Sequence, residues 1–284
     1  MAEIIDGNEI SKRIRGEIAA QVESLREKTG VTPGLAAVLV GNDPASEIYV
    51  ARKRSACFEV GMHSEEHRLG ARTTQSELLD LIGELNTDPK VHGILVQLPL
   101  PEAINEVTVL RTVSPLKDVD GFHPENMGML MEGNPRFISC TPYGIMEIID
   151  GLGVNVEGMD IVVVGRSNIV GKPVAAMLLN RDATVTVCHL CTKNLAHFTR
   201  EAEILIVAIG CSEFIKGDMI KEGAIIIDVG INRNEKGKIT GDVDFESVFP
   251  KCSHITPVPG GVGPMTIAML LKNTLMAAEI YARG

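Results

Sequence analysis

Residues 161–173 read Ile161-Val162-Val163-Val164-Gly165-Arg166-Ser167-Asn168-Ile169-Val170-Gly171-Lys172-Pro173, and this stretch decides the fold class. Its apolar start predicts a buried strand, its first glycine a tight turn, and the residues from the second glycine onward a helix. Such a turn lets the backbone approach a phosphate, and the unpaired N–H groups and dipole at the helix start attract an anion. The glycine spacing fits neither a P-loop nor G-x-G-x-x-G, so an ordinary turn without a ligand stays open as an alternative.

Further apolar strands follow this turn at intervals that leave room for helices. The sequence predicts strands over residues 161–164, 184–187, 204–208 and 224–228. Strands that alternate with helical segments predict a Rossmann-like, doubly wound parallel sheet. A glycine-rich run, Pro259–Pro264, then leads into a closing helix over residues 265–281.

The residues before this sheet also alternate between the two kinds of segment. We expect helices over residues 10–26, 44–61 and 75–85, and strands over residues 34–40, 62–69 and 92–96. Residues 99–142 are rich in Pro, Gly and Asp, which predicts long functional loops with a short helix. The expected fold class is therefore two α/β domains, one of residues 1–141 plus 265–284 and one of residues 142–264.

Composition and charge narrow the function. The chain has 284 residues and a net charge of -10, without a long basic run, which argues against nucleic acid as a partner. Its apolar stretches are too short to cross a membrane, and its N-terminus does not resemble a signal peptide, so we expect a cytoplasmic protein. Its six cysteines fit free thiols in a reducing compartment. Cys188 and Cys191 form a C-x-x-C without a second ligand pair, so no metal site is predicted.

The residues after the second strand of the sheet indicate which coenzyme binds. NAD-preferring folds place Asp or Glu there, where the carboxylate binds the ribose 2′-hydroxyl. This chain instead has Cys188-His189-Leu190-Cys191-Thr192-Lys193, and Arg166 adds positive charge nearby. The pattern favours NADP, with NAD as the possible alternative.

Two side chains in the first part suit proton transfer. Tyr49 and Lys53 stand four residues apart on a predicted helix and share a face. Burial of such a lysine lowers its pKa towards neutrality. The alternative is a solvated basic helix, since Arg52 and Arg54 flank Lys53.

Two further candidates lie at the ends of apolar segments. Gln97 ends the predicted strand in Val96-Gln97-Leu98-Pro99, where a carboxamide can bind a substrate amide, hydrogen-bond Lys53, or merely cap a turn. The loop Lys117-Asp118-Val119-Asp120-Gly121 offers two carboxylates, either for an amino-pyrimidine-like edge or for turn formation alone.

These pieces together resemble one family. Ser46-x-x-Tyr49-Val50-x-x-Lys53, Val96–Pro101, Lys117–Gly121, Gly165–Pro173 and Pro257–Thr266 are similar, in order and from end to end, to bifunctional methylenetetrahydrofolate dehydrogenase/methenyltetrahydrofolate cyclohydrolase. The resemblance implies two α/β domains with a cleft between them, a homodimer paired through the nucleotide domain, and tetrahydrofolate derivatives as substrates.

The resemblance also implies a role for each matching residue. Lys53 is then the central catalytic residue, Tyr49 orients the folate, Gln97 tunes Lys53, and Asp120 holds the pterin. Leu98, Pro259, Gly260 and Gly261 complete the substrate site. The implied coenzyme site consists of Gly165, Arg166, Ser167, Ile169, His189, Thr192, Ile231, Gly263 and Thr266.

The chain departs from the family pattern at one position, and three alternative functions are considered. The family often has Ser or Arg after the His of the second-strand motif, whereas this chain has Leu190, which removes one expected contact to the 2′-phosphate. A short-chain dehydrogenase shares Tyr-x-x-x-Lys, but there the glycine-rich turn precedes the pair along the chain. A dehydrogenase without cyclohydrolase activity and a non-catalytic nucleotide-binding module stay as alternatives.

Overall fold

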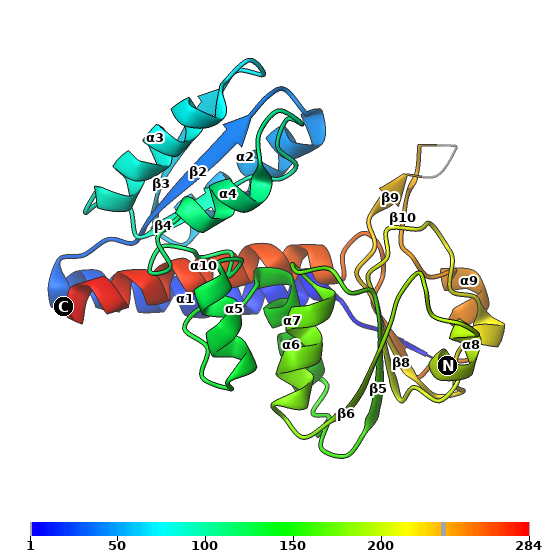
Figure 1. Cartoon of the computed structure of the whole chain (residues 1–284). Helices are drawn as coiled ribbons and strands as arrows, with labels where there is room; N and C mark the ends of the chain where they lie inside the picture. The colour runs from blue at the N-terminus through cyan, green and yellow to red at the C-terminus, as the bar shows by residue number, and fades with distance from the viewer. Residues whose placement is uncertain (1, 234–236, 284) are drawn as a thin grey trace. The chain divides into compact units, whose positions relative to one another are not determined.

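A computed structural model of the chain describes residues 2–233 and 237–283, and these form two compact units (Figure 1). Unit 1 consists of Met1–Ser11, Leu130–Asn134 and Thr141–Thr266. Unit 2 consists of Lys12–Met129, Pro135–Cys140 and Ile267–Gly284.

Unit 1 is built on a parallel sheet of six strands. Its strands are β1 (Glu3–Ile4), β5 (Asp160–Val164), β6 (Thr184–Cys188), β7 (Ile204–Val207), β8 (Ile225–Asp228) and β11 (His254–Ile255). They lie in the order β1-β11-β8-β7-β5-β6, and each neighbouring pair is parallel. The prediction of a Rossmann-like sheet is therefore confirmed.

Short helices and a hairpin complete unit 1. They are α6 (Cys140–Gly151), α7 (Gly171–Leu179), α8 (Leu195–Thr199), the 3-10 helix η1 (Gly217–Met219), α9 (Phe245–Val248) and the antiparallel pair β9 (Asn232–Arg233) and β10 (Ile239–Thr240). The core contains fully buried aliphatic residues from neighbouring strands, among them Leu205, Val207 and Ile226. Each such side chain contributes about 1.5–3 kcal/mol when removed from water, so a core without Trp is sufficient.

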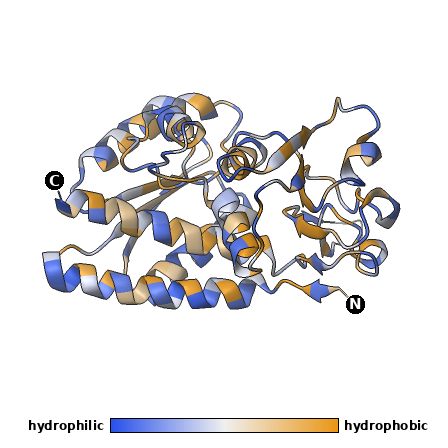
Figure 2. Cartoon of the chain, turned by 90° about the horizontal axis from the view of Figure 1, so that it is seen from below, coloured by the Kyte–Doolittle hydropathy of each residue, from blue (hydrophilic) through white to orange (hydrophobic). Residues whose placement is uncertain are grey.

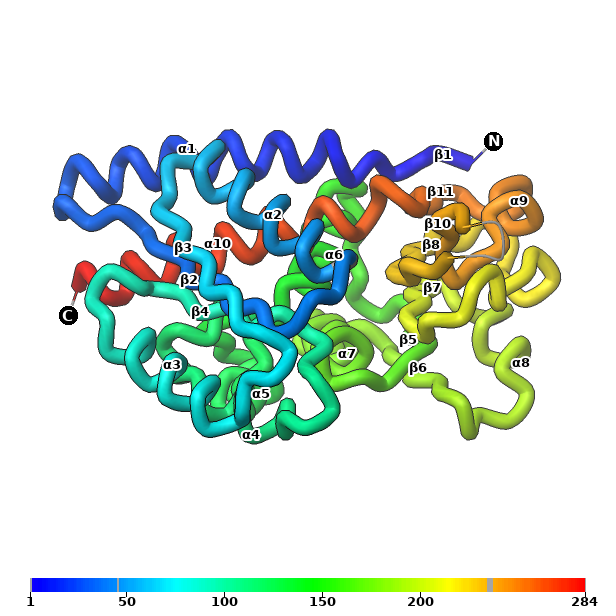
Figure 3. The backbone as a smooth tube through the Cα atoms, turned by 90° about the horizontal axis from the view of Figure 1, so that it is seen from above, coloured from blue at the N-terminus to red at the C-terminus, as the bar shows by residue number. Residues whose placement is uncertain are grey.

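Unit 2 has a smaller parallel sheet in the order β3-β2-β4, which can be followed in Figure 3. Its strands are β2 (Gly34–Val40), β3 (His63–Leu69) and β4 (Gly93–Val96). Its helices are α2 (Pro44–Glu59), α3 (Gln75–Thr87), α4 (Glu106–Thr112) and parts of α1 (Gly7–Thr29), α5 (Pro124–Met131) and α10 (Val262–Arg283). Figure 2 shows hydrophilic and hydrophobic residues alternating along α1, as expected for a half-buried helix.

Local sequence signals explain where α2 and α3 begin. The Asp43 carboxylate accepts the backbone N–H of Ser46 at 2.8 Å and so caps α2, which begins at Pro44, the first residue of the predicted helix. Thr74 and Glu77 form a capping box at the start of α3. Gly61, the last residue of the predicted helix, lies just beyond α2 and has a φ of 78°, which a side chain would disfavour.

The structure differs from the predicted organisation in two places. Residues 1–11 belong to unit 1 rather than to the first predicted domain, because β1 pairs with β11. Residues 99–142 contain α4, α5 and the start of α6, more helix than the single short one expected. Among the described residues, no helix is long and apolar enough to cross a bilayer.

His92, just before β4, ties the small sheet together through a neutral ring. Its Nδ1 accepts the backbone N–H of Gly34 at 3.0 Å, and the ring packs edge-on against Tyr281 at 5.0 Å. Burial, helped by the nearby Lys117 ammonium, lowers the pKa of His92.

This lowered pKa predicts a loss of stability in mild acid. The unfolded chain binds a proton at this residue more readily than the folded one, so stability is retained above about pH 6.5 and falls as the pH drops below it. In His92→Asn, an amide oxygen replaces Nδ1 and does not titrate. Urea unfolding between pH 7.5 and 5.5 is expected to show a shallower loss for the variant, by at most about 1.4 kcal/mol per pH unit. Identical slopes would contradict this.

Candidate active site

Lys53 and Gln97 are joined directly in unit 2. Helix α2 places Tyr49 and Lys53 on one face, and both side chains are half-buried. The Lys53 Nζ donates a hydrogen bond of 3.0 Å to Gln97 Oε1. Gln97 follows β4 directly, and its backbone N–H donates to Val38 of β2, so the sheet fixes its position. Its amide nitrogen also donates to the Leu98 carbonyl at 2.7 Å, which leaves Oε1 facing the lysine.

The basic run around Lys53 divides between two environments. Arg52 and Arg54 are exposed, and Arg54 donates to Glu66 on β3 at 3.1 Å. Lys53 points instead to the end of β4. The alternative of a uniformly solvated basic helix therefore does not describe Lys53.

Asp120 is a carboxylate of unit 2 whose pKa is strongly altered by its surroundings. Its half-buried side chain follows a segment that pairs with β4 through Ile94 and Asp118. Burial raises the pKa of Asp120 to about 6, while the Lys53 ammonium opposes this rise and the Asp118 carboxylate adds to it. Asp120 therefore changes charge close to neutral pH, beside a lysine.

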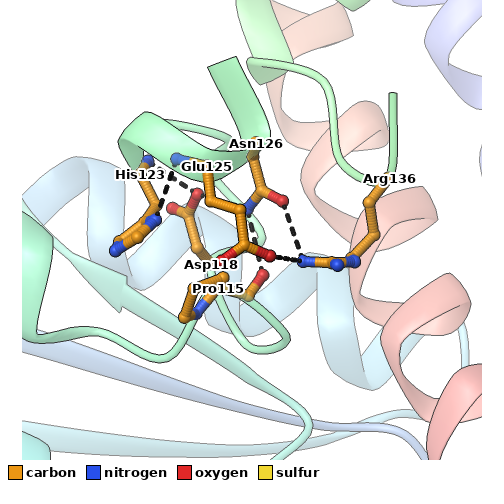
Figure 4. Close-up of polar contacts among 6 residues, drawn as sticks. All are labelled: Pro115, Asp118, His123, Glu125, Asn126 and Arg136. Carbon is orange, nitrogen blue, oxygen red and sulfur yellow. Dashed lines mark hydrogen bonds and ion pairs between the residues drawn. The ribbon is translucent and has the colours of Figure 1, made fainter. Parts of the chain in front are cut away.

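The other carboxylate of this loop, Asp118, has a structural role. It is buried and accepts the backbone N–H groups of Phe122 at 3.1 Å and His123 at 2.8 Å. It also accepts the side-chain amide of Asn126 at 2.8 Å (Figure 4). The same amide of Asn126 reaches the Pro115 carbonyl at 3.0 Å. Asp118 thus holds the loop against the start of α5. The sequence alone did not show that Asp118, and not Asp120, has this structural role.

Arg136 supports this arrangement from the segment after α5. It donates to Glu125 at 2.8 Å and to Asn126 Oδ1 at 3.4 Å (Figure 4). Gly121 then turns the chain with a φ of 71°, and a Cβ there would lie 2.6 Å from the Ser139 nitrogen. The glycine of this loop is therefore required by close packing.

Sequence reasoning missed two residues that support the loop of Asp120, namely Cys140 and Asn273. The buried Cys140 thiol donates to the Val119 carbonyl at 3.3 Å and lies 3.9 Å from Asp120 Oδ1. The buried Asn273 of α10 donates to the carbonyls of Val119 at 2.7 Å and Ile138 at 2.8 Å. A fully buried Asn in an apolar helix was the available signal, because such a group needs partners.

The glycine turn of unit 1 is as tight as predicted. Gly165 follows β5 directly with a φ of 130°, and a Cβ there would lie 2.3 Å from the Ala208 carbonyl oxygen. A Cβ on Gly171 would lie 2.1 Å from the Gly165 carbonyl oxygen. Both glycines therefore let the strand, the turn and α7 pack closely, which leaves the backbone open to a phosphate.

Ser167 corrects the expectation that the first N–H groups of α7 are all unpaired. Its hydroxyl oxygen accepts the backbone N–H of Val170 at 3.1 Å and that of Gly171 at 3.4 Å. The Ser167 hydroxyl therefore already joins these two amides. Arg166 and Ile169 are exposed beside it.

The turn after β6 is ordered by its own side chains. The His189 backbone N–H donates to the Thr192 hydroxyl at 2.8 Å, and the Cys191 backbone N–H donates to His189 Nδ1 at 3.2 Å. Leu190 between them is fully exposed. Residues 188–193 contain no carboxylate, as read from the sequence.

The remaining predicted residues of unit 1 lie around the start of α10. Ile231 is 54% exposed, and a Cβ on Gly263 would lie 4.0 Å from its Cδ1. The Thr266 hydroxyl is 2.9 Å from that of Thr141. Gly260, after Pro259, has a φ of 107°, and the carbonyl oxygen of Gly261 lies where a Cβ on Gly7 would be.

The predicted residues therefore divide into two groups. Tyr49, Lys53, Gln97, Leu98 and Asp120 are in unit 2, and the others are in unit 1. Within residues 2–233 and 237–283, no group of three or more His, Cys, Asp or Glu side chains is arranged to hold a metal ion.

Comparison with known proteins places the whole chain in one group. Residues 5–120 match the family model "Tetrahydrofolate dehydrogenase/cyclohydrolase, catalytic domain", and residues 139–282 match the NAD(P)-binding domain of the same family. A curated relative from Geobacter metallireducens, "Bifunctional protein FolD 2", is 57% identical over 100% of this chain and 99% of its own length.

Solved structures agree. The bifunctional FolD methylenetetrahydrofolate dehydrogenase/cyclohydrolase of Campylobacter jejuni is 51% identical, with a TM-score of 0.96 over 99% of both chains. The Trypanosoma brucei methylenetetrahydrofolate dehydrogenase-cyclohydrolase, complexed with NADP cofactor and inhibitor, is 38% identical, with a TM-score of 0.95 over 100% of this chain and 99% of its own.

The raised pKa of Asp120 predicts that its charge destabilises the fold. The folded state favours the protonated acid, so stability relative to an uncharged residue is lost as the pH rises from about 4 to about 6. Asp120→Asn is expected to unfold at higher urea concentration than the wild type at pH 8, by up to about 3 kcal/mol. The gain is expected to fall to about 1 kcal/mol at pH 4.5 and to vanish only below about pH 4. A gain of the same size at both pH values would contradict the assignment.

Proposed function

The chain belongs to the tetrahydrofolate dehydrogenase/cyclohydrolase family, and we propose that it catalyses two consecutive steps on one folate. The first is NADP-dependent oxidation of 5,10-methylenetetrahydrofolate to 5,10-methenyltetrahydrofolate. The second is hydrolysis of that product to 10-formyltetrahydrofolate. The observation that carries the proposal is the hydrogen bond between Lys53 and Gln97 beside the titratable Asp120.

The oxidation step depends on positioning more than on proton transfer. When bound, NADP supplies the acceptor for the hydride that leaves the methylene bridge. The close packing at Gly165 and Gly171 provides the open backbone that a pyrophosphate needs. In our proposal Ser167, Ile169, Gly263 and Thr266 line the coenzyme, and Ile231 lies against its nicotinamide.

The hydrolysis step needs a group that moves protons. Water attacks the electrophilic methenyl carbon, and the ring then opens at one nitrogen, which must gain a proton. We assign this proton handling to Lys53, which Gln97 Oε1 holds at 3.0 Å. Asp120 grips the amino-pyrimidine edge of the pterin, and its carboxylate also attracts the Lys53 ammonium. Tyr49 packs on the folate, while Leu98, Pro259, Gly260 and Gly261 complete its site.

The coenzyme assignment rests on charge around the β5 and β6 turns. No carboxylate follows β6 in residues 188–193 to repel a 2′-phosphate, and Arg166 is exposed on the neighbouring turn. Leu190 is fully exposed and offers no hydrogen bond to that phosphate. NADP is therefore the preferred coenzyme, and NAD is the second candidate.

We also propose a homodimer and a cytoplasmic location. Strand β6 forms one edge of the six-stranded sheet, and Val187 and Leu190 at its end are exposed, which supports pairing through unit 1. All six cysteines are free thiols, which suits a reducing compartment. Sedimentation equilibrium at two concentrations tests the dimer, and a monomer at both would refute it.

A dehydrogenase without cyclohydrolase activity is the remaining alternative. The Lys53–Gln97 pair favours the bifunctional enzyme. Hydride transfer does not need an amine held in place, whereas the hydrolysis step does. Incubation of the protein with 5,10-methylenetetrahydrofolate and either NADP or NAD distinguishes the bifunctional enzyme from the monofunctional one. The bifunctional enzyme shows methenyl absorbance that grows and then decays faster than in buffer, whereas a monofunctional one shows growth alone.

Lys53→Ala is expected to reduce cyclohydrolase turnover by at least about 100-fold, since a positioned proton-transfer group contributes that much. The measurement is decay of 5,10-methenyltetrahydrofolate absorbance. Arg54→Ala is the matched control, because its side chain is exposed on the same helix and pairs with Glu66 on β3. Unchanged hydrolysis in Lys53→Ala would refute the assigned role.

Arg166→Ala is expected to raise the KM for NADP by about tenfold and that for NAD much less, because only NADP carries the phosphate that the guanidinium attracts. Initial rates of methenyl formation with each coenzyme measure both values. Arg200→Ala, an exposed arginine after α8, is the control. Equal losses with both coenzymes would show that Arg166 does not read the 2′-phosphate.

A further inference from the structure

Asp242, which no sequence motif singled out, is a buried carboxylate that gathers two loops of unit 1. It is 0% exposed and lies between β10 and α9. Its Oδ2 accepts the backbone N–H groups of Ile209 at 2.7 Å and Gly210 at 3.0 Å. Its Oδ1 accepts the backbone N–H of Cys211 and the side-chain amide of Asn232, each at 2.8 Å. Four donors therefore converge on one charge.

A second buried carboxylate holds Asp242 in place. Asp228, at the end of β8, accepts the backbone N–H groups of Asp242 at 2.9 Å, Val243 at 3.0 Å and Gly230 at 3.0 Å. Two glycines make room for the pair. A Cβ on Gly230 would lie 2.3 Å from Asp242 Oδ1, and one on Gly241 would lie 1.8 Å from Asp228 Oδ2.

The two loops that Asp242 joins lie where the coenzyme is expected. Residues 209–211 follow β7 and residues 230–232 follow β8, and ligands of open parallel sheets bind at these carboxyl ends. The sheet order is β8-β7-β5-β6 at this point. A dinucleotide with its pyrophosphate at the β5 turn and its adenosine beside β6 places its nicotinamide half over β7 and β8.

We propose that Asp242 is a positioning residue for hydride transfer, because it fixes both loops that support the nicotinamide half of the coenzyme. The inference rests on the proposed dehydrogenase activity. Asp242 does not touch the reacting atoms and acts through the backbone of residues 209–211 and through Asn232. A carboxylate suits this task, because it accepts several N–H groups at once, whereas an amide accepts on one side only.

The decisive variant is Asp242→Asn in the full chain. The substituted amide nitrogen faces backbone N–H groups that then lack an acceptor, so the loops loosen. We expect the Kd for NADP, measured by calorimetry, to rise about tenfold, and dehydrogenase kcat to fall by a similar factor. Cyclohydrolase turnover of supplied 5,10-methenyltetrahydrofolate is expected to stay within about twofold, since its residues lie in unit 2.

Isotope effects separate positioning from simple loss of stability. With substrate deuterated at the methylene bridge, a misplaced nicotinamide makes hydride transfer more rate-limiting, so the isotope effect on kcat is expected to increase. Asp244→Asn is the matched control, because Asp244 is two residues away, half-exposed and paired with Lys216 at 3.2 Å. It is expected to retain the wild-type Kd for NADP, dehydrogenase kcat, cyclohydrolase turnover and isotope effect.

Asn232→Ala keeps the proposal testable if Asp242→Asn does not fold. It removes one of the four donors and is expected to show the same pattern more weakly. Wild-type coenzyme affinity and isotope effect in the folded variant, or equal loss of both activities, would overturn the role of Asp242. Absence of methylenetetrahydrofolate-dependent NADP reduction in the wild type would instead refute the proposed function.

Discussion

Parallel strand pairing is the constraint on which both groups of functional residues depend. Each sheet aligns the carboxyl ends of its strands, so residues far apart in the sequence follow neighbouring strands. Gln97 follows β4 and meets Lys53 from α2, while Gly165 follows β5 and packs on the residue after β7. The Gly165 backbone approaches the Ala208 carbonyl this closely only because glycine has no Cβ, and this packing shapes the turn at which we propose that the coenzyme binds.

Four buried or half-buried aspartates show how the same side chain serves different purposes. Asp118, Asp228 and Asp242 each accept several N–H groups, so their charge organises loops. Asp120 instead lies beside the Lys53 ammonium and the Cys140 thiol. Burial raises the pKa of both Asp120 and Asp228 to about 6, so the pKa alone does not separate the two roles. The partners do: a carboxylate that accepts several backbone N–H groups organises loops, whereas one beside a lysine is placed for binding and proton chemistry.

Sequence patterns predicted the parts of this molecule that local physics determines. Strand β2 occupies the predicted residues 34–40, because seven apolar residues end at a glycine, and α2 begins at its predicted proline. The Tyr49–Lys53 face and the Gly165 turn follow from the same short-range rules. Long-range contacts could not be predicted in this way. Strand β1 forms because it pairs with β11, and Asp242 organises unit 1 because groups of two distant loops donate hydrogen bonds to it. The hydrogen bonds from the Val170 and Gly171 amides to the Ser167 hydroxyl depend on the Ser167 rotamer, which the spacing of residues in the sequence does not determine.

The two proposed reactions place opposite demands on the protein, and the two units meet them separately. Hydride transfer requires fixed distances, and unit 1 supplies them through carboxylates that are saturated with backbone donors and through glycines packed against carbonyls. Hydrolysis requires groups that change protonation, and unit 2 supplies an amine held by a neutral carboxamide beside an acid that titrates near neutrality. The Gln97 carboxamide is neutral, so it orients the Lys53 amine through a hydrogen bond without adding a second carboxylate beside Asp120.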